Sequence, residues 1–113
     1  MKFTTISSAL VMTGALSLSP LANALDADAA QALAKKEGCF KCHAIDKKKE
    51  AKSMKEIAGK YKGKADAEAK MLAQIIEGPK VKNAEGVEED HKIIKTKDKA
   101  EQKNLIDWIL SLK

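Results

Sequence analysis

The chain has 113 residues, with 21 lysines, no arginine and 16 acidic residues, so its formal net charge is +5. This length forms one small domain, and the lack of arginine argues against nucleic-acid recognition, where arginine reads guanine and phosphate. Because few side chains are aromatic and a third are charged, the chain can build only a thin core, and we expect an additional source of cohesion.

Residues 1–24 have the features of a secretory signal peptide. Lys2 gives a positive start, residues 6–18 are mostly apolar, and an Ala-Asn-Ala triplet ends at Ala24. The apolar stretch is too short for a permanent membrane span, although a retained membrane anchor is the alternative. We predict cleavage after Ala24 and export to the periplasm. The remaining domain, residues 25–113, has 20 lysines against 16 acidic residues, a net charge of +4.

Two helices are predicted in the first half of this domain. The first covers about residues 28–37 and ends at Gly38, directly before a pair of cysteines. The second is short, at residues 53–60. Its first turn has the form of a capping box, in which Ser53 and Glu56 satisfy each other's backbone N–H groups.

Two further helices are predicted in the second half. One covers about residues 66–78 and ends at a Gly-Pro pair. The other begins with a second capping-box pattern, Asp98 and Glu101, and has apolar residues at i, i+3, i+4 and i+7: Leu105, Trp108, Ile109 and Leu112. No segment alternates like a strand and no hairpin turn is recognised, so the predicted fold class is all-α. The connections at residues 44–52 and 78–97 are polar and rich in lysine.

The sequence Cys39-Phe40-Lys41-Cys42-His43 is the C-x-x-C-H haem attachment motif. On a helical turn, residues i and i+3 project from the same side, so Cys39 and Cys42 can reach the two vinyl groups on one edge of a porphyrin. His43 is then carried over the ring, where its imidazole can bind the iron. The motif predicts one haem c, bound through two thioethers, whose apolar faces supply the missing core.

Three other interpretations of the motif remain open. A thioredoxin-like redox pair expects a βαβ context, which the sequence lacks. A structural disulfide is possible in an oxidising compartment. A zinc site could use Cys39, Cys42, His43 and His91, although Cys42 and His43 are adjacent and zinc ligands are usually spaced further apart.

The mature chain resembles small bacterial class I cytochromes c of the c551/c552 type. The resemblance is carried by residues 33–46 (LAKKEGCFKCHAID), 54–63 (MKEIAGKYKG) and 105–113 (LIDWILSLK). It implies about four helices wrapped round one covalently bound haem, with the first and last helices crossing. It also implies a soluble, monomeric periplasmic carrier of single electrons, not an enzyme. Leu105 and Trp108 are expected to pack the terminal helix pair.

The chain departs from this family at the second iron ligand, which is usually a methionine from a proline-rich loop. Met54 and Met71 lie in predicted helices and are more simply core residues. Counted back from Trp108, the ligand loop falls near residues 86–92, where His91 is the only other histidine. A second imidazole would favour ferric iron and give a low potential. The alternative is a solvated histidine, with an open or labile sixth position that binds NO, CO or O₂.

Several lysines are expected near the haem crevice if the resemblance holds. Lys41 lies inside the motif, and Lys47–Lys49 and Lys52 follow closely. Most lysine runs are simply solvated surfaces, but a subset beside an exposed haem edge would steer an acidic redox partner. No pattern of nucleophile and base, paired carboxylates or phosphate loop indicates catalysis.

Overall fold

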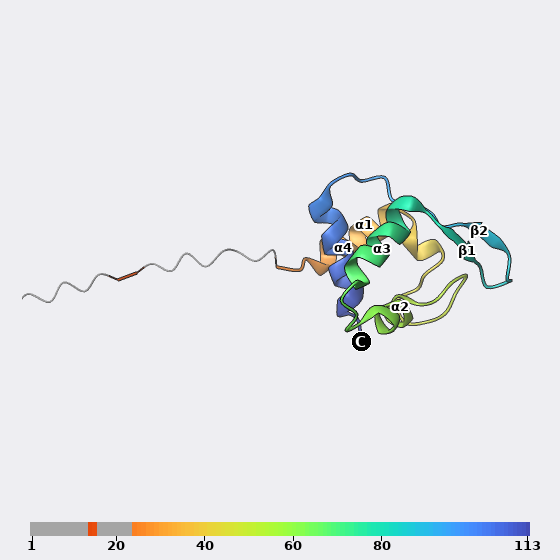
Figure 1. The fold of residues 1–113 in the computed structure, drawn as a ribbon, viewed down its shortest axis with the longest axis horizontal. Coiled ribbons are helices and arrows are strands. Elements are labelled where there is room, and N and C mark those ends of the chain that lie inside the picture. The colour runs from red at the N-terminus through yellow and green to blue at the C-terminus, as the bar shows by residue number, and fades with distance from the viewer. Residues whose placement is uncertain (1–13, 16–23) are drawn as a thin grey trace, which may run out of the picture.

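Four α-helices and one small β-hairpin make up the part of the chain that the structure, a computed structural model, describes: residues 14–15 and 24–113. The predicted leader lies almost wholly outside this part. The elements follow the order α1 (Ala27–Lys36), the short 3₁₀ turn η1 (Cys39–Lys41), α2 (Met54–Tyr61), α3 (Ala67–Glu77), β1 (Lys80–Lys82), β2 (Glu88–Asp90) and α4 (Lys99–Ser111) (Figure 1). No helix of the described residues has the length and apolarity needed to cross a bilayer.

The starts of α1, α2 and α4 are set by side chains that accept hydrogen bonds from free backbone N–H groups, whereas Asp66 at the start of α3 makes no such bond. The Asp26 side chain accepts from the N–H of Ala29 at the start of α1. At the start of α2 the capping box is complete: the N–H of Ser53 donates to Glu56 Oε2 over 2.7 Å, and the N–H of Glu56 donates to Ser53 Oγ over 3.1 Å. The predicted capping box of α2 is therefore confirmed.

The second capping box is only half formed. The Asp98 side chain accepts from the N–H groups of Ala100 and Glu101, as a cap should. The Glu101 carboxylate, however, accepts from the hydroxyl of Thr96 and not from the N–H of Asp98. The prediction of a reciprocal box was wrong here because Thr96 supplies a closer donor.

Gly78 ends α3 in a left-handed conformation, with φ of 62°. A Cβ atom at this position would lie 2.6 Å from the carbonyl oxygen of His91 and 2.8 Å from Cγ2 of Ile93. The chain that returns from the hairpin therefore passes so close that only glycine fits.

The core lies where α1 packs against α4, with α2 and α3 also resting on α4 (Figure 1). Its buried members are Ala30, Leu33, Ala34, Met54, Met71, Leu105, Ile106, Trp108 and Ile109. The Trp108 ring meets Phe40 edge to face, with centroids 6.2 Å apart, so it joins the helix pair to the cysteine motif. The expected packing of the first and last helices, with Leu105 and Trp108 between them, is confirmed.

The start of α1 is also fastened to α4 by a pair of hydrogen bonds. The N–H of Asp26 donates to Asn104 Oδ1 over 2.9 Å, and Asn104 Nδ2 donates to the carbonyl of Asp26 over 2.8 Å. Both hydrogen-bonding groups of this backbone unit are thus satisfied by one side chain.

The expectation that no strand or hairpin occurs was wrong for residues 80–90. Strands β1 and β2 pair antiparallel, with Lys80 opposite Asp90 and Lys82 opposite Glu88. The strands were not recognised because they have no apolar face. Cross-strand pairs of opposite charge stabilise them instead, including a 2.8 Å ion pair between Lys80 and Asp90. Apart from this hairpin the described fold is helical, and the all-α class is confirmed.

We expect Ile106→Ala to lower the free energy of unfolding by about 2–5 kcal/mol, because the side chain is buried within the core. Ile93→Ala is the matched control, since Ile93 is 50% exposed and its truncation should change stability by no more than about 0.5 kcal/mol. Urea unfolding measures both. Equal losses in the two variants would contradict the placement of the core.

Candidate cofactor site

The cysteine motif follows α1 after a sharp change of direction. Gly38 adopts a left-handed conformation, with φ of 81°, and the chain then forms the short turn η1. The N–H groups of Cys42 and His43 both donate to the carbonyl of Cys39. Both cysteines line one cavity, with Cys39 half-buried and Cys42 exposed. Burial raises the pKa of the Cys39 thiol.

His43 is oriented by a backbone carbonyl. Its Nδ1 lies 2.6 Å from the carbonyl oxygen of Lys52, which requires the proton on Nδ1 and leaves Nε2 without it, free to bind a metal. The N–H of Ala51 donates to the carbonyl of Cys42, which holds this stretch against the motif. The stretch directly before α2 thus supplies the carbonyl that orients the imidazole.

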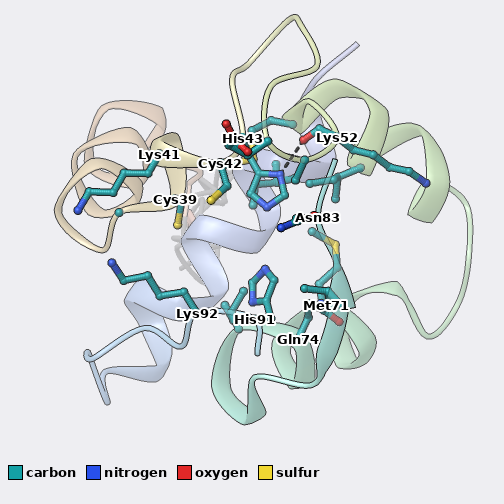
Figure 2. Close-up of a pocket in the computed structure, with 18 of the residues that line it drawn as sticks. Cys39, Lys41, Cys42, His43, Lys52, Met71, Gln74, Asn83, His91 and Lys92 are labelled. Carbon is teal, nitrogen blue, oxygen red and sulfur yellow. Dashed lines mark hydrogen bonds between the residues drawn. The ribbon is translucent and has the colours of Figure 1, made fainter. Parts of the chain in front are cut away.

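His91 lies directly across the cavity from His43. It follows β2, and its N–H donates to the carbonyl of Pro79, which extends the hairpin pairing by one step. The two imidazole centroids are 6.2 Å apart, with 38° between the ring planes (Figure 2). Although its neighbours in the sequence are charged, the ring is not placed as a solvated loop histidine.

The surroundings of His91 favour the neutral form of its ring. Burial and, next, the nearby His43 lower the pKa of His91, while the backbone of Lys92 and of Gln74 opposes the shift. A neutral imidazole is the form that binds a metal. Among the described residues, none makes a hydrogen bond of good geometry with the buried Nδ1 of His91. The backbone of Gln74 and of Lys92 lies near the His91 ring, but none of the described residues gives its Nδ1 a bond as well formed as that between His43 and Lys52.

The cavity between the two histidines measures about 750 Å³, within the range of about 300–1,000 Å³ that is typical of ligand sites. Its apolar walls come from α2, α3 and α4 and include Met54, Ile57, Met71, Ile75, Leu105 and Ile109. Met54 and Met71 are buried, as expected of core residues, and both also line the cavity.

Asn83 also points into the cavity, although nothing in the sequence analysis singled it out (Figure 2). Its Oδ1 accepts from the N–H groups of Glu85 and Val87, each over 3.0 Å, so its amide nitrogen is the group left to face a ligand. Beside it, the N–H of Ala84 donates to the carbonyl of Glu50, which joins the hairpin to the loop before α2. The only sequence signal was an Asn-x-x-Gly spacing typical of a turn.

These residues fit a haem held between two imidazoles. Two imidazoles on opposite sides of one metal ion, each with its nitrogen about 2 Å from it, have centroids about 6 Å apart, and 6.2 Å is observed. The side chains of Cys39 and Cys42 lie to one side of the line between the two imidazoles, and apolar side chains line the cavity around it (Figure 2). The zinc alternative lacks support, because within residues 14–15 and 24–113 no three His, Cys, Asp or Glu side chains are grouped to hold a metal ion.

Comparison with known proteins identifies the family of the chain. The family model described as Cytochrome c matches residues 27–113. Cytochrome c-551 of Pseudomonas aeruginosa is 39% identical over 69 residues, which are 61% of this chain and 62% of that protein, so the chain spans less than two thirds of this relative. Cytochrome c2 of Rhodocyclus tenuis is 35% identical over 83 residues, covering 73% of this chain and 90% of that protein.

A solved structure is similar over nearly its whole length. The class 1 cytochrome MtoD from Sideroxydans lithotrophicus ES-1 superposes with a TM-score of 0.75 and is 52% identical in sequence, and the match covers 79% of this chain and 98% of that one. The helices and the cavity between them therefore belong to a known type of fold.

We expect Asn83→Ala to loosen the hairpin, because two backbone donors lose their acceptor. Each lost bond costs about 0.5–1.5 kcal/mol, so amide hydrogen exchange at Val87 should become about tenfold faster. Asn83→Asp is the control, since a carboxylate keeps both acceptors. Unchanged exchange at Val87 in Asn83→Ala would contradict the role of this side chain.

Proposed function

The chain belongs to the cytochrome c family, and on that basis we propose that it carries single electrons in the periplasm through a haem iron bound by His43 and His91. One covalently attached haem c and electron transfer follow from family membership itself. The subcellular location, the residues that bind the haem and the ligation state are the parts that we propose.

Cys39 and Cys42 are proposed to form the two thioethers, and His43 to bind the iron from the same side. The support is local geometry: one short turn carries all three residues, and the carbonyl of Lys52 fixes the orientation of the His43 ring. A bound haem supplies a centre that gains and loses one electron. The protein need only hold the two imidazoles in place, because no bond has to form or break.

The opposition of the two imidazoles is the observation that carries the proposed second ligand. His91 faces His43, with 6.2 Å between the ring centroids. Burial lowers the pKa of His91 and so favours the neutral imidazole, which is the form that binds a metal. An imidazole donates more strongly than the thioether of methionine and favours ferric iron, so a low reduction potential is expected.

Export to the periplasm is proposed from the leader pattern of residues 1–24. The predicted cut after Ala24 falls directly before the folded domain, since Asp26 caps α1. Ala24 and Leu25 are exposed and outside any helix, which suits cleavage by a peptidase. The processed domain would begin at Leu25.

Binding of small gases is the second candidate function, and one observation favours it. Nδ1 of His91 makes no hydrogen bond of good geometry with any described residue, whereas Nδ1 of His43 is bonded to Lys52. A histidine ligand is normally oriented through its second nitrogen. A ligand without that support leaves the iron more readily, which would open a position for CO, NO or O₂.

Carbon monoxide separates the two candidates. We expect the reduced wild-type protein to bind CO only slowly, with no prompt shift of its absorption bands, because His91 occupies the sixth position. His91→Ala should bind CO promptly and shift its absorption bands. Absorption spectra of both proteins, reduced and oxidised, with and without CO, measure this.

Lys92→Ala is the control for the His91 variant, because it changes the neighbouring residue and leaves the imidazole. It should behave as the wild type. If the reduced wild type binds CO as readily as His91→Ala does, then His91 is not a firm ligand and gas binding becomes the better function.

A rim of lysines around the cavity is proposed to guide an acidic redox partner. Six lysines line it: Lys41, Lys48, Lys52, Lys60, Lys82 and Lys92. Of the run expected from the sequence, Lys48 lies in this lining, and Lys49 donates through Nζ to the carbonyl of Phe40 over 3.2 Å. The same lining includes Glu37, Glu50, Glu89 and Asp90, so six lysines against four carboxylates leave a net charge of +2. A net positive charge beside the cavity raises the rate of encounter with a negative surface.

Reversing the charge of Lys47, Lys48 and Lys49 to glutamate should slow electron transfer to an acidic partner severalfold at low salt. The effect should vanish at high salt, because the Debye length falls to about 3 Å at 1 M. Stopped-flow rates over a range of ionic strength measure this. Lys62, Lys64 and Lys113 are exposed and lie outside the cavity lining, and their reversal should have a smaller effect. A rate independent of salt would rule out this steering.

A further inference from the structure

Glu37 is a buried carboxylate that the proposed site does not use. Its side chain is 6% exposed, and it stands at the C-terminal end of α1, two residues before Cys39. A negative charge is unfavourable at a helix C-terminus, and burial of a charge costs free energy unless good hydrogen bonds compensate it. A residue in such a position calls for a compensating contact.

That contact reaches the segment that carries His91. Glu37 Oε2 accepts from the backbone N–H of Lys95 over 2.7 Å, across 58 residues of sequence. A bond between an N–H and a carboxylate is short and about twice as strong as a neutral one. Glu37 also lines the cavity, so it touches both the haem-binding space and the chain that returns from the hairpin.

The same segment is fastened on its other side by backbone bonds. The N–H of His91 donates to the carbonyl of Pro79, and the N–H of Ile94 donates to the carbonyl of Ile75. Both acceptors belong to α3 or to the residues just after it, whereas Glu37 belongs to the end of α1 beside the attachment motif. The bond from Glu37 therefore spans from the half of the site that holds His43 to the half that holds His91.

We propose that Glu37 is a positioning residue that holds the His91 segment closed over the iron and whose negative charge favours the ferric state. This inference depends on the proposed ligation by His91. The segment that carries His91 is held by backbone bonds on one side and by Glu37 on the other, so the position of its imidazole depends on how firmly both sides are held. A buried charge beside the cavity is also poorly screened by solvent.

Two substitutions separate the two effects. Glu37→Ala removes both the acceptor and the charge, whereas Glu37→Gln keeps a weaker neutral acceptor and removes the charge. The rate of CO binding to the reduced protein reports how often His91 leaves the iron. The reduction potential reports the charge.

We expect CO to bind at least tenfold faster to Glu37→Ala than to the wild type, with Glu37→Gln in between. The reduction potential should become more positive in both variants. Glu77→Gln, which removes an exposed carboxylate outside the cavity lining, should change neither value. Ile106→Ala controls for a general loss of stability and should leave the CO rate unchanged.

Unchanged CO rates and potentials in both Glu37 variants would overturn the inference. If Glu37→Ala fails to fold, Glu37→Gln alone decides, because it must raise both the rate and the potential. An equal rise of the CO rate in Ile106→Ala would also overturn it, since the effect would then be loss of stability. Failure of the proposed ligation looks different: the reduced wild type itself would bind CO promptly.

Discussion

The opposition of His43 and His91 is the arrangement on which the rest of the site depends, and a backbone carbonyl contributes to the placement of each. The carbonyl of Lys52 fixes the first ring, and the carbonyl of Pro79 fixes the chain at the second. Neither acceptor depends on the identity of a side chain. Folding brings the two rings to a separation that suits one iron between them. The β-hairpin leads directly into His91, whose N–H continues the strand pairing.

The small hydrophobic core and the cavity are built from some of the same apolar side chains. Trp108, Phe40 and the apolar faces of α1 and α4 form a small packed unit at one end of the domain. Apolar side chains of α2, α3 and α4 that belong to or pack against this core also line the cavity. A covalently attached haem therefore completes a core that the side chains only begin, and a highly charged surface can be tolerated around it.

The parts that could be predicted from the sequence are those encoded by short spacings. The four helices, the complete capping box at Ser53 and the attachment motif are each recognised from residues that lie a few positions apart in the sequence. The hairpin was missed because its strands pair through lysine and glutamate and carry no apolar alternation. Glu37 and Asn83 were missed for a different reason: their roles depend on partners, such as the N–H of Lys95, that only the folded chain brings near.

Gly78 gives a sequence signal for the close approach of the His91 segment to the end of α3. A histidine in a charged loop is a poor signature by itself, since most such residues are solvated. The glycine that ends α3 is more informative, because the carbonyl of His91 passes too close for any side chain. An attachment motif followed by a helix-ending Gly-Pro pair and then by a histidine after a short charged hairpin is a composite pattern. A sequence search with it would find other chains that place a histidine at this position.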